Sequence, residues 1–252
     1  MIAAQRRNLI LEMLQSDGAV SITAAAERLS TSTVTVRRDL DQLAAMGLLA
    51  RTHGGAVAHG SSRESPYTEK IELAATEKQR IGRMAARLVN DGDTLVIGPG
   101  TTTEALAGHL RDRSGLTVVT NSLPVAEAFV GTPENEVIVT GGALRASIRA
   151  LVGETAIQAL RGLHADTAFL SGNGLAADFG LSTPSLAVAD VDRVIATAAY
   201  QLVVLADHTK IGVRTAVRTA ATEAITHVVT DDAAPAPDLD ALREAGVDVQ
   251  VA

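Results

Sequence analysis

From residue 76 onward, short apolar runs alternate with segments that have the periodicity of helices. Runs of four or five residues are too short for helices, and their continuous apolar character is typical of strands buried on both faces. Their alternation with helical segments such as 77–90 favours a mostly parallel sheet with helices on both of its faces. We therefore predict a C-terminal α/β domain over residues 76–252, with strands at 94–98, 117–120, 136–140, 167–171, 202–206, 226–230 and 247–251.

The residues that directly follow these strands are small, hydroxyl-bearing, amide or cationic. Because the carboxyl ends of parallel strands meet at one edge of the sheet, ligands bind there. Segment 100–103 begins a helix after the first strand, an arrangement that holds anions, and Lys210 is one of only three lysines in the chain. We predict a polar-ligand site with a phosphate subsite at this edge, formed by Gly100, Thr101, Thr102, Thr103, Asn121, Gly142, Gly172, Asn173, Gly174, Asp207 and Lys210.

The start of the helix after the first strand has a second interpretation. Thr101 and Glu104 have the spacing of a capping box, in which two side chains satisfy free amides of the first turn. A dinucleotide site is excluded, because Thr103 stands where the fingerprint needs a third glycine and the second strand ends in Asn121 instead of an acid. The six histidines are dispersed and cysteine is absent. We therefore expect no metal site, no disulfide and no cofactor.

The first 57 residues have the pattern of a small domain rich in helices. One helix is expected over 3–15, a short second helix after Ser21 and a third helix after Ser32, since serine is a favoured N-cap. Two short strands around Gly54-Gly55 would follow as a wing. This order is that of a winged helix-turn-helix, a fold whose recognition helix enters the major groove of DNA.

The third helix of this segment has two contrasting faces. One face, spaced i, i+4 and i+7, is expected to face the core and consists of Val36, Leu40 and Leu43. At roughly 100° per residue, Val34 and Arg38 point nearly opposite, and Arg37 flanks them. An exposed valine beside two arginines suits a major groove, where the valine can contact a thymine methyl and arginine can contact guanine or phosphate.

Charge and composition indicate which partners and which cellular location to expect. The net charge is −7, but the first 60 residues carry six arginines against five acidic residues. Local fields steer binding more than the total does, so the negative sum does not exclude double-stranded DNA as a partner. Residues 58–75 are polar and irregular and are the expected linker. With no signal peptide pattern and no apolar run near 20 residues, we expect a cytoplasmic protein without a membrane partner.

The segment "STSTVTVRRDLDQLAAMGLLARTHGGAV" resembles the DNA-binding head of DeoR-family bacterial transcription regulators. The match covers Arg37-Arg38-Asp39-Leu40, Arg51 and His53-Gly54-Gly55-Ala56. The variable pair of that family's motif falls on Thr33 and Val34, which we expect to set the operator preference. The residues expected to contact DNA are Ser32, Thr33, Val34, Thr35, Arg37, Arg38 and, in the wing, His53.

The rest of the chain resembles the effector domain of the same family, whose fold is related to ribose-5-phosphate isomerase. Matching pieces include Thr76-Glu77-Lys78, Gly100-Thr101-Thr102 and the segment from Asp207 to Lys210. The resemblance implies a sugar phosphate as effector, held by the lysine and the Gly-Thr-Thr loop. Two departures bear on the ligand: Gly98-Pro99 replaces the family's Asp-Ser, and the helix after Pro184 lacks the usual glutamates and lysine, with Leu186, Val188 and Asp190 instead.

The same resemblance bears on catalysis. The isomerase relatives carry an acid-rich stretch after the fourth strand, whereas this chain has none between Ser171 and Asp178. Proton transfer next to a substrate carbon needs such carboxylates, so we expect no catalytic residue. The predicted function is a ligand-responsive transcription repressor, a homo-oligomer of two or four chains. The alternative is a sugar-phosphate isomerase-like or deaminase-like enzyme with a vestigial DNA-binding head.

Overall fold

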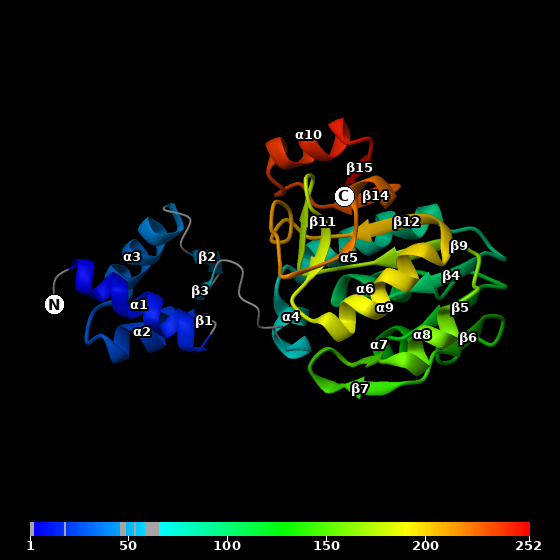
Figure 1. The fold of residues 1–252 in the computed structure, drawn as a ribbon, viewed down its shortest axis with the longest axis horizontal. Coiled ribbons are helices and arrows are strands. Elements are labelled where there is room, and N and C mark those ends of the chain that lie inside the picture. The colour runs from blue at the N-terminus through cyan, green and yellow to red at the C-terminus, as the bar shows by residue number, and fades with distance from the viewer. Residues whose placement is uncertain (1–2, 18, 46–48, 53, 59–65) are drawn as a thin grey trace. The chain divides into compact units, whose positions relative to one another are not determined.

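The computed structural model describes residues 3–17, 19–45, 49–52, 54–58 and 66–252. The chain divides into two compact units, Met1–Arg63 and Glu64–Ala252 (Figure 1). Within the described ranges, no helix combines the length and the apolar character that crossing a membrane requires. Each unit has its own hydrophobic core, and the two are described separately.

Unit 1 is a winged helix-turn-helix, as predicted from the sequence. Its small antiparallel sheet has the order β1-β3-β2, so the wing strands are joined by a short strand that the sequence analysis missed. A three-residue strand has no readable periodicity. Strand β1 exists through its pairing with β3, in which Ser21 lies opposite Gly55. The two strands approach closely at this glycine, where a Cβ would lie 1.9 Å from the carbonyl oxygen of Val20. The elements are α1 (Ala3–Asp17), β1 (Ala19–Ser21), α2 (Ile22–Arg28), α3 (Thr33–Ala45), β2 (Leu49–Thr52) and β3 (Gly55–Ala58).

The core of unit 1 confirms the inward face predicted for α3. Val36, Leu40 and Leu43 are all buried and pack against apolar residues of α1 and α2. One charged pair joins α1 to α3: the Arg6 guanidinium binds the carboxylate of Asp39, with Nη2 3.1 Å from Oδ1. Asp39 is 4 % exposed, so this pairing satisfies a carboxylate that would otherwise be buried without a partner.

Unit 2 is built on a sheet of seven described strands that are all parallel. The strand order is β15-β14-β12-β9-β4-β5-β6. The strands lie within a few residues of the predicted positions, because short apolar runs bounded by turns specify buried strands locally. They are β4 (Thr94–Ile97), β5 (Thr117–Thr120), β6 (Glu136–Val139), β9 (Ala165–Leu170), β12 (Ala199–Leu205), β14 (His227–Thr230) and β15 (Asp248–Val251).

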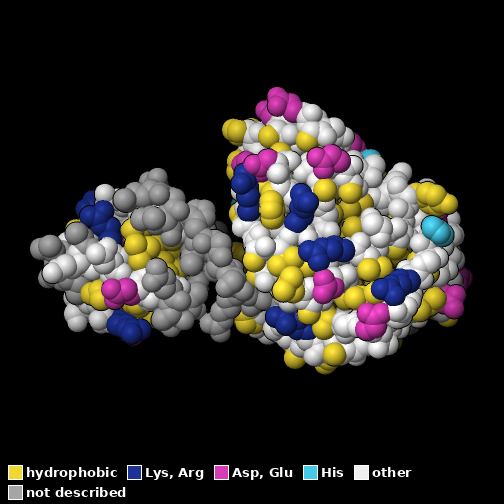
Figure 2. Space-filling view, in the orientation of Figure 1, with side chains coloured by type: hydrophobic (Ala, Val, Ile, Leu, Met, Phe, Trp, Pro, Cys, Tyr) yellow, Lys and Arg dark blue, Asp and Glu magenta, His cyan; other side chains and the backbone are white. Residues whose placement is uncertain are grey.

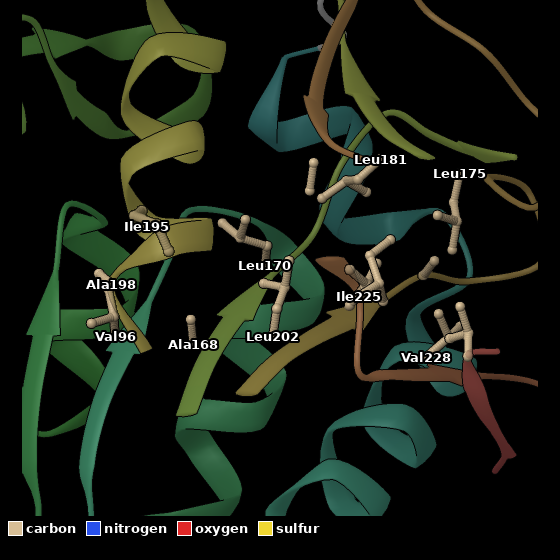
Figure 3. Close-up of a cluster of buried hydrophobic side chains, with 14 of the residues drawn as sticks. Val96, Ala168, Leu170, Leu175, Leu181, Ile195, Ala198, Leu202, Ile225 and Val228 are labelled. Carbon is tan, nitrogen blue, oxygen red and sulfur yellow. The ribbon is translucent and has the colours of Figure 1, made fainter. Parts of the chain in front are cut away.

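Helices cover both faces of this sheet, and alternate strand residues enter two separate cores. In the first core, Val96 and Leu170 pack against Ile195 and other residues of α8, α9 and α10 (Figure 3). In the second core, Leu95 and Phe169 pack against α5, α6 and α7. The covering helices are α5 (Ala75–Ala85), α6 (Thr101–His109), α7 (Leu123–Ala128), α8 (Glu154–Leu160), α9 (Leu186–Thr197) and α10 (Ala236–Glu244).

Several short elements of unit 2 were not predicted. Residues 67–72 of the expected linker form helix α4, which belongs to unit 2. Two more groups of strands lie outside the main sheet: a hairpin of β7 (Ala143–Arg145) and β8 (Ala150–Val152), and a sheet of β10 (Gly174–Ala176), β11 (Gly180–Thr183) and β13 (Val217–Ala220). Three or four residues cannot reveal a pairing partner, since the partner strands lie far away in the sequence. Three short 3-10 turns complete the unit: η1 (Ala86–Leu88), η2 (Ala146–Ile148) and η3 (Thr222–Ala224).

Candidate functional site

The first candidate surface is the exposed face of α3 in unit 1. Val34 is 64 % exposed, and Arg37 and Arg38 are exposed beside it. No salt bridge is recorded for either arginine among the described residues. The exposed face of α3 therefore carries one apolar side chain beside two cationic ones, as the sequence predicts.

The residues around the start of α3 have structural roles as well. The Ser32 hydroxyl accepts a hydrogen bond from the Thr35 amide at 3.1 Å and lies 2.8 Å from the Thr35 hydroxyl, so Ser32 is the N-cap that the sequence predicts. Thr33 is the first helical residue and is exposed. His53, which we expected to reach DNA from the wing, lies outside the described residues.

An ion pair links α3 to the wing strands. The Arg51 guanidinium binds Asp41 at 2.8 Å through Nε and donates to the carbonyl oxygen of Gly55 at 2.5 Å. Asp41 lies on the outer side of α3, where its carboxylate would repel a DNA phosphate. The pairing with Arg51 offsets that charge and fixes β2 and β3 relative to α3.

The second candidate site is a pocket in unit 2 at the point where the strand order changes direction. From β4, in the middle of the sheet, the chain continues outward through β5 and β6, and it then returns to β9 on the other side of β4. The loops after β4 and β9 therefore leave in opposite directions and open a crevice, which is where open α/β sheets bind ligands. The two loops are linked by the Ser171 hydroxyl, which donates to the Pro99 carbonyl at 3.4 Å.

The pocket brings together most of the residues predicted at this edge. From the predicted set, it is lined by Gly100, Thr101, Thr102, Gly172, Asn173, Asp207 and Lys210. These residues follow β4, β9 and β12, which are three neighbouring strands of the sheet.

Four predicted residues do not line the pocket. Thr103 is buried, and its hydroxyl donates back to the loop carbonyl of Gly98 at 2.8 Å. Asn121 follows β5, one strand further out, and donates to the Leu151 carbonyl at 3.0 Å. The two glycines allow close packing: an added Cβ would lie 2.7 Å from the Val152 oxygen at Gly142 and 2.4 Å from the Val213 oxygen at Gly174.

The capping box predicted for α6 is wrong. Gly100, with a φ of 155°, is the N-cap, and no side chain caps the helix. Thr101 is already inside the helix, and Glu104 turns away to accept a hydrogen bond from the Tyr67 hydroxyl at 2.5 Å. The first amides of α6 are therefore left without a side-chain partner beside the pocket, an arrangement that favours an anion.

Gly100→Ala is expected to destabilise the protein by about 1–3 kcal/mol, because its φ is unfavourable for a side chain. The new Cβ would also lie 2.0 Å from Oγ of Ser171. Thermal unfolding of the full chain measures this as a melting temperature lower by several degrees. Gly108→Ala, on the same helix with open space around it, is the control and should not destabilise. An unchanged melting temperature for Gly100→Ala would show that the loop tolerates a side chain.

All three lysines of the chain line this pocket: Lys70, Lys78 and Lys210. Lys78 is only 5 % exposed, and its ammonium group donates to the carbonyl oxygens of Lys70 and Leu73. Burial lowers the pKa of Lys78, the nearby Asp207 carboxylate opposes this, and the Lys210 ammonium adds to it. Three lysines and two carboxylates, Asp192 and Asp207, line this crevice, so its formal charge is +1 in a chain whose net charge is negative.

Two buried carboxylates also line the pocket. Asp207 is 1 % exposed, and its Oδ1 accepts hydrogen bonds from the amide of Thr209, at 3.0 Å, and from the hydroxyl of the same residue. Asp192, on α9, is 2 % exposed and lies one helical turn after Val188, which also lines the pocket. The carboxylate lost from the loop after β4, where Gly98 stands, is thus matched by one from a different element.

Several lining residues were missed by sequence reasoning. The rarity of lysine, which pointed to Lys210, applies equally to Lys70 and Lys78 and could have found them. No local signal marked Tyr67 or Asp192, because their place depends on how α4 and α9 pack against the sheet edge. The complete set of missed residues is Tyr67, Lys70, Leu73, Lys78, Pro99, Ile148, Ser171, Thr183, Val188, Asp192 and Leu205.

Solved structures similar to this chain match it only in part. Ribose 5-phosphate isomerase A of Methanocaldococcus jannaschii matches with a TM-score of 0.41 and 17 % identity, over 54 % of each chain. The eIF2B delta subunit of Chaetomium thermophilum matches with a TM-score of 0.40 and 23 % identity, over 57 % of this chain and 50 % of the other. These values are too low to support a conclusion about this protein.

Sequence relatives match along nearly the whole chain. The HTH-type transcriptional regulator YgbI of Escherichia coli is 37 % identical over 93 % of this chain and 92 % of its own. The glycerol-3-phosphate regulon repressor of E. coli is 31 % identical over the full length of both. The lactose phosphotransferase system repressor of Lactococcus lactis is 40 % identical over 68 % of this chain and 69 % of its own.

Both units also match models of known domain families. Residues 6–62 match the DeoR-like helix-turn-helix domain. Residues 73–232 match the DeoR C terminal sensor domain. Together with the relatives, these matches show that the chain belongs to the DeoR family of transcriptional regulators.

Proposed function

We propose that this protein is a cytoplasmic transcription repressor. It reads operator DNA with α3, and its affinity for DNA is changed by a phosphorylated metabolite, most simply a sugar phosphate, bound in the pocket of unit 2. The observation that carries the proposal is the gathering of all three lysines around the uncapped start of α6. Because the same chain carries a DNA-reading unit, we infer that ligand binding in this pocket serves to regulate DNA binding.

The DNA-reading half of the proposal rests on α3. Its exposed valine and two exposed arginines offer an apolar contact and two cationic, bidentate donors, a combination that suits base edges and phosphates in a major groove. On the face of unit 2 seen in Figure 2, Lys and Arg side chains are spread among apolar ones, and acidic side chains gather over α10. That face offers no continuous basic track for DNA.

The ligand half rests on the chemistry of the pocket wall. A phosphate dianion needs cations and free amides, which the lysines and the first turn of α6 supply. Hydroxyl groups of a sugar need acceptors and donors, and Asn173, Thr183 and Asp192 supply both. Two relatives have names that refer to glycerol 3-phosphate and to a sugar phosphotransferase system, which supports a phosphorylated effector.

A regulator is favoured over an enzyme. The buried Asp207 is held by Thr209, and this arrangement positions the loop of Lys210 rather than freeing a base. The three relatives named above are a transcriptional regulator and two repressors by name. Winged helix-turn-helix proteins read paired half-sites as dimers, so we propose a homo-oligomer of two or four chains. Measurable turnover of pentose or hexose phosphates by the purified protein would contradict the sensor assignment.

A thermal-shift screen of the full chain against free and phosphorylated sugars tests the ligand. A true effector at about 100 times its Kd should stabilise the protein by about 2.7 kcal/mol, because it binds only the folded state. For a chain of this size, that is a rise in melting temperature of roughly 5–10 °C. The free sugar paired with each phosphate is the control. Equal shifts from both members of every pair would argue against a phosphate subsite.

A further inference from the structure

Helix α4 is part of the pocket wall although it lies at the start of unit 2. Tyr67 and Lys70 of this helix, and Leu73 directly after it, line the pocket. Tyr67 comes four positions after Arg63, the last residue of unit 1. A displacement of α4 therefore moves the point at which the chain enters unit 2 from the DNA-reading unit.

Tyr67 ties α4 to two other parts of unit 2. Its hydroxyl donates to Oε2 of Glu104 at 2.5 Å, and its ring lies under the Arg149 guanidinium at 4.3 Å. Glu104 lies on α6, two positions after Thr102, which lines the pocket. Burial and the Glu104 carboxylate both raise the pKa of Tyr67, so the phenol keeps its proton in this contact at neutral pH and well above it.

Lys78 ties the other end of α4 to the pocket. Its ammonium group, from α5, donates to the carbonyl oxygens of Lys70 and Leu73, which lie at the end of α4 and directly after it. The same ammonium group lines the pocket near Asp207 and Lys210. An ammonium group has three donors, and Lys78 uses two of them on these carbonyls. The third donor can bind an anion, and an anion that draws the ammonium group toward itself pulls on the two contacts to α4.

We propose that α4 is the element through which an anion in the pocket acts on the DNA-reading unit, by loosening the Lys78 contacts and the Tyr67–Glu104 bond. This inference rests on the proposed function and adds the route of regulation. An anion at the start of α6 attracts Lys78 and shifts the helix turn that carries Glu104. Both changes act on α4. The anion therefore binds with a different free energy when α4 is held by these contacts and when it is released from them.

The sequence provides a direct reporter for this helix. The chain contains no tryptophan and only two tyrosines, Tyr67 and Tyr200. Tyr200 is 80 % exposed and does not line the pocket. The variant Tyr200→Phe therefore leaves Tyr67 as the sole tyrosine. A hydrogen bond to a carboxylate quenches tyrosine fluorescence, so emission of this variant measures the Tyr67–Glu104 contact.

The experiment titrates the full-length Tyr200→Phe variant with inorganic phosphate and records tyrosine emission and the heat of binding. The expected result is a rise in emission with the same midpoint as the heat. Binding heat without any change in emission would overturn the role of α4 and leave the anion site intact. Absence of binding heat up to millimolar phosphate would instead overturn the anion site, and the inference with it.

A second measurement tests whether the Tyr67–Glu104 hydrogen bond transmits phosphate binding to α4 or only helps to pack this helix. Tyr67→Phe keeps the ring under Arg149 and removes the hydroxyl that binds Glu104. Hydrogen exchange of the amides of residues 67–73 is compared with and without phosphate in the full chain. We expect phosphate to speed this exchange in the wild type and in Tyr200→Phe, and the change to be lost in Tyr67→Phe at phosphate concentrations that the heat of binding shows to saturate that variant. The same phosphate-dependent change in all three proteins would refute the proposal.

Discussion

Replacing Arg37 and Arg38 together by alanine is expected to weaken operator binding by about 2–6 kcal/mol, that is, from roughly 30-fold to more than 10⁴-fold. Both arginines are exposed on α3 beside Val34. Each supplies a bidentate donor for a guanine edge or a phosphate, worth about 1–3 kcal/mol. The operator can be obtained by selecting tight-binding fragments from random duplex DNA with the wild-type protein. Fluorescence anisotropy with such a fragment then measures the loss.

The salt dependence adds a second readout. Each contact between an arginine and a DNA phosphate releases counterions, so losing one lowers the slope of log K against log salt by about 0.9. The matched control is Arg161→Ala with Arg243→Ala, which removes two partly exposed arginines from unit 2. The control should bind the operator like the wild type. If the α3 variant keeps wild-type affinity and slope, α3 is not the recognition helix.

Replacing Lys210 by alanine is expected to weaken effector binding by roughly 10-fold to 100-fold. The loss corresponds to one charge-assisted hydrogen bond, about 1.5–3 kcal/mol. Lys210 lines the pocket with Lys78 and lies directly after the loop fixed by Asp207 and Thr209. Operator affinity without effector should stay unchanged, because Lys210 lies in unit 2 and α3 in unit 1. Operator release as a function of effector concentration measures the shift.

The control for Lys210 is Arg214→Ala, four residues further along the chain. Arg214 pairs with Asp178 on the surface and does not line the pocket. This variant removes one cation from the same stretch and should respond to effector like the wild type. A Lys210→Ala protein with a normal effector response would remove Lys210 from the site. A loss of operator affinity in both variants would point to a general charge effect.

The helix caps, apolar faces and buried strands were largely predictable from the sequence. Ser21 and Ser32 cap α2 and α3 as expected, and Val36, Leu40 and Leu43 face the core. These features depend on interactions within a few residues, which the local pattern determines. For the same reason, the polar residues after each strand could be found, and with them the edge of the sheet where the pocket lies.

The membership of the pocket was decided by tertiary structure. The strand order places the loops after β4, β9 and β12 side by side at one pocket. Asn121, after the neighbouring β5, binds the Leu151 carbonyl instead, and Gly142, after β6, packs against Val152. Strand order arises from hydrogen bonds between segments that are far apart in the chain, so no local pattern reveals it. The partner of Glu104 was missed for the same reason: Tyr67 lies 37 residues earlier, in a helix hidden within the expected linker.

The sequence by itself therefore determined the two domains, the family resemblance, the face of α3 that we assign to DNA and the cation at Lys210. Only the tertiary structure showed that Lys70 and Lys78 join Lys210, that Asp192 brings a carboxylate from α9, and that α4 closes the pocket wall. The physical reason is the range of the interactions. Periodicity and caps act over one or two helical turns, whereas a binding pocket is assembled from long-range packing.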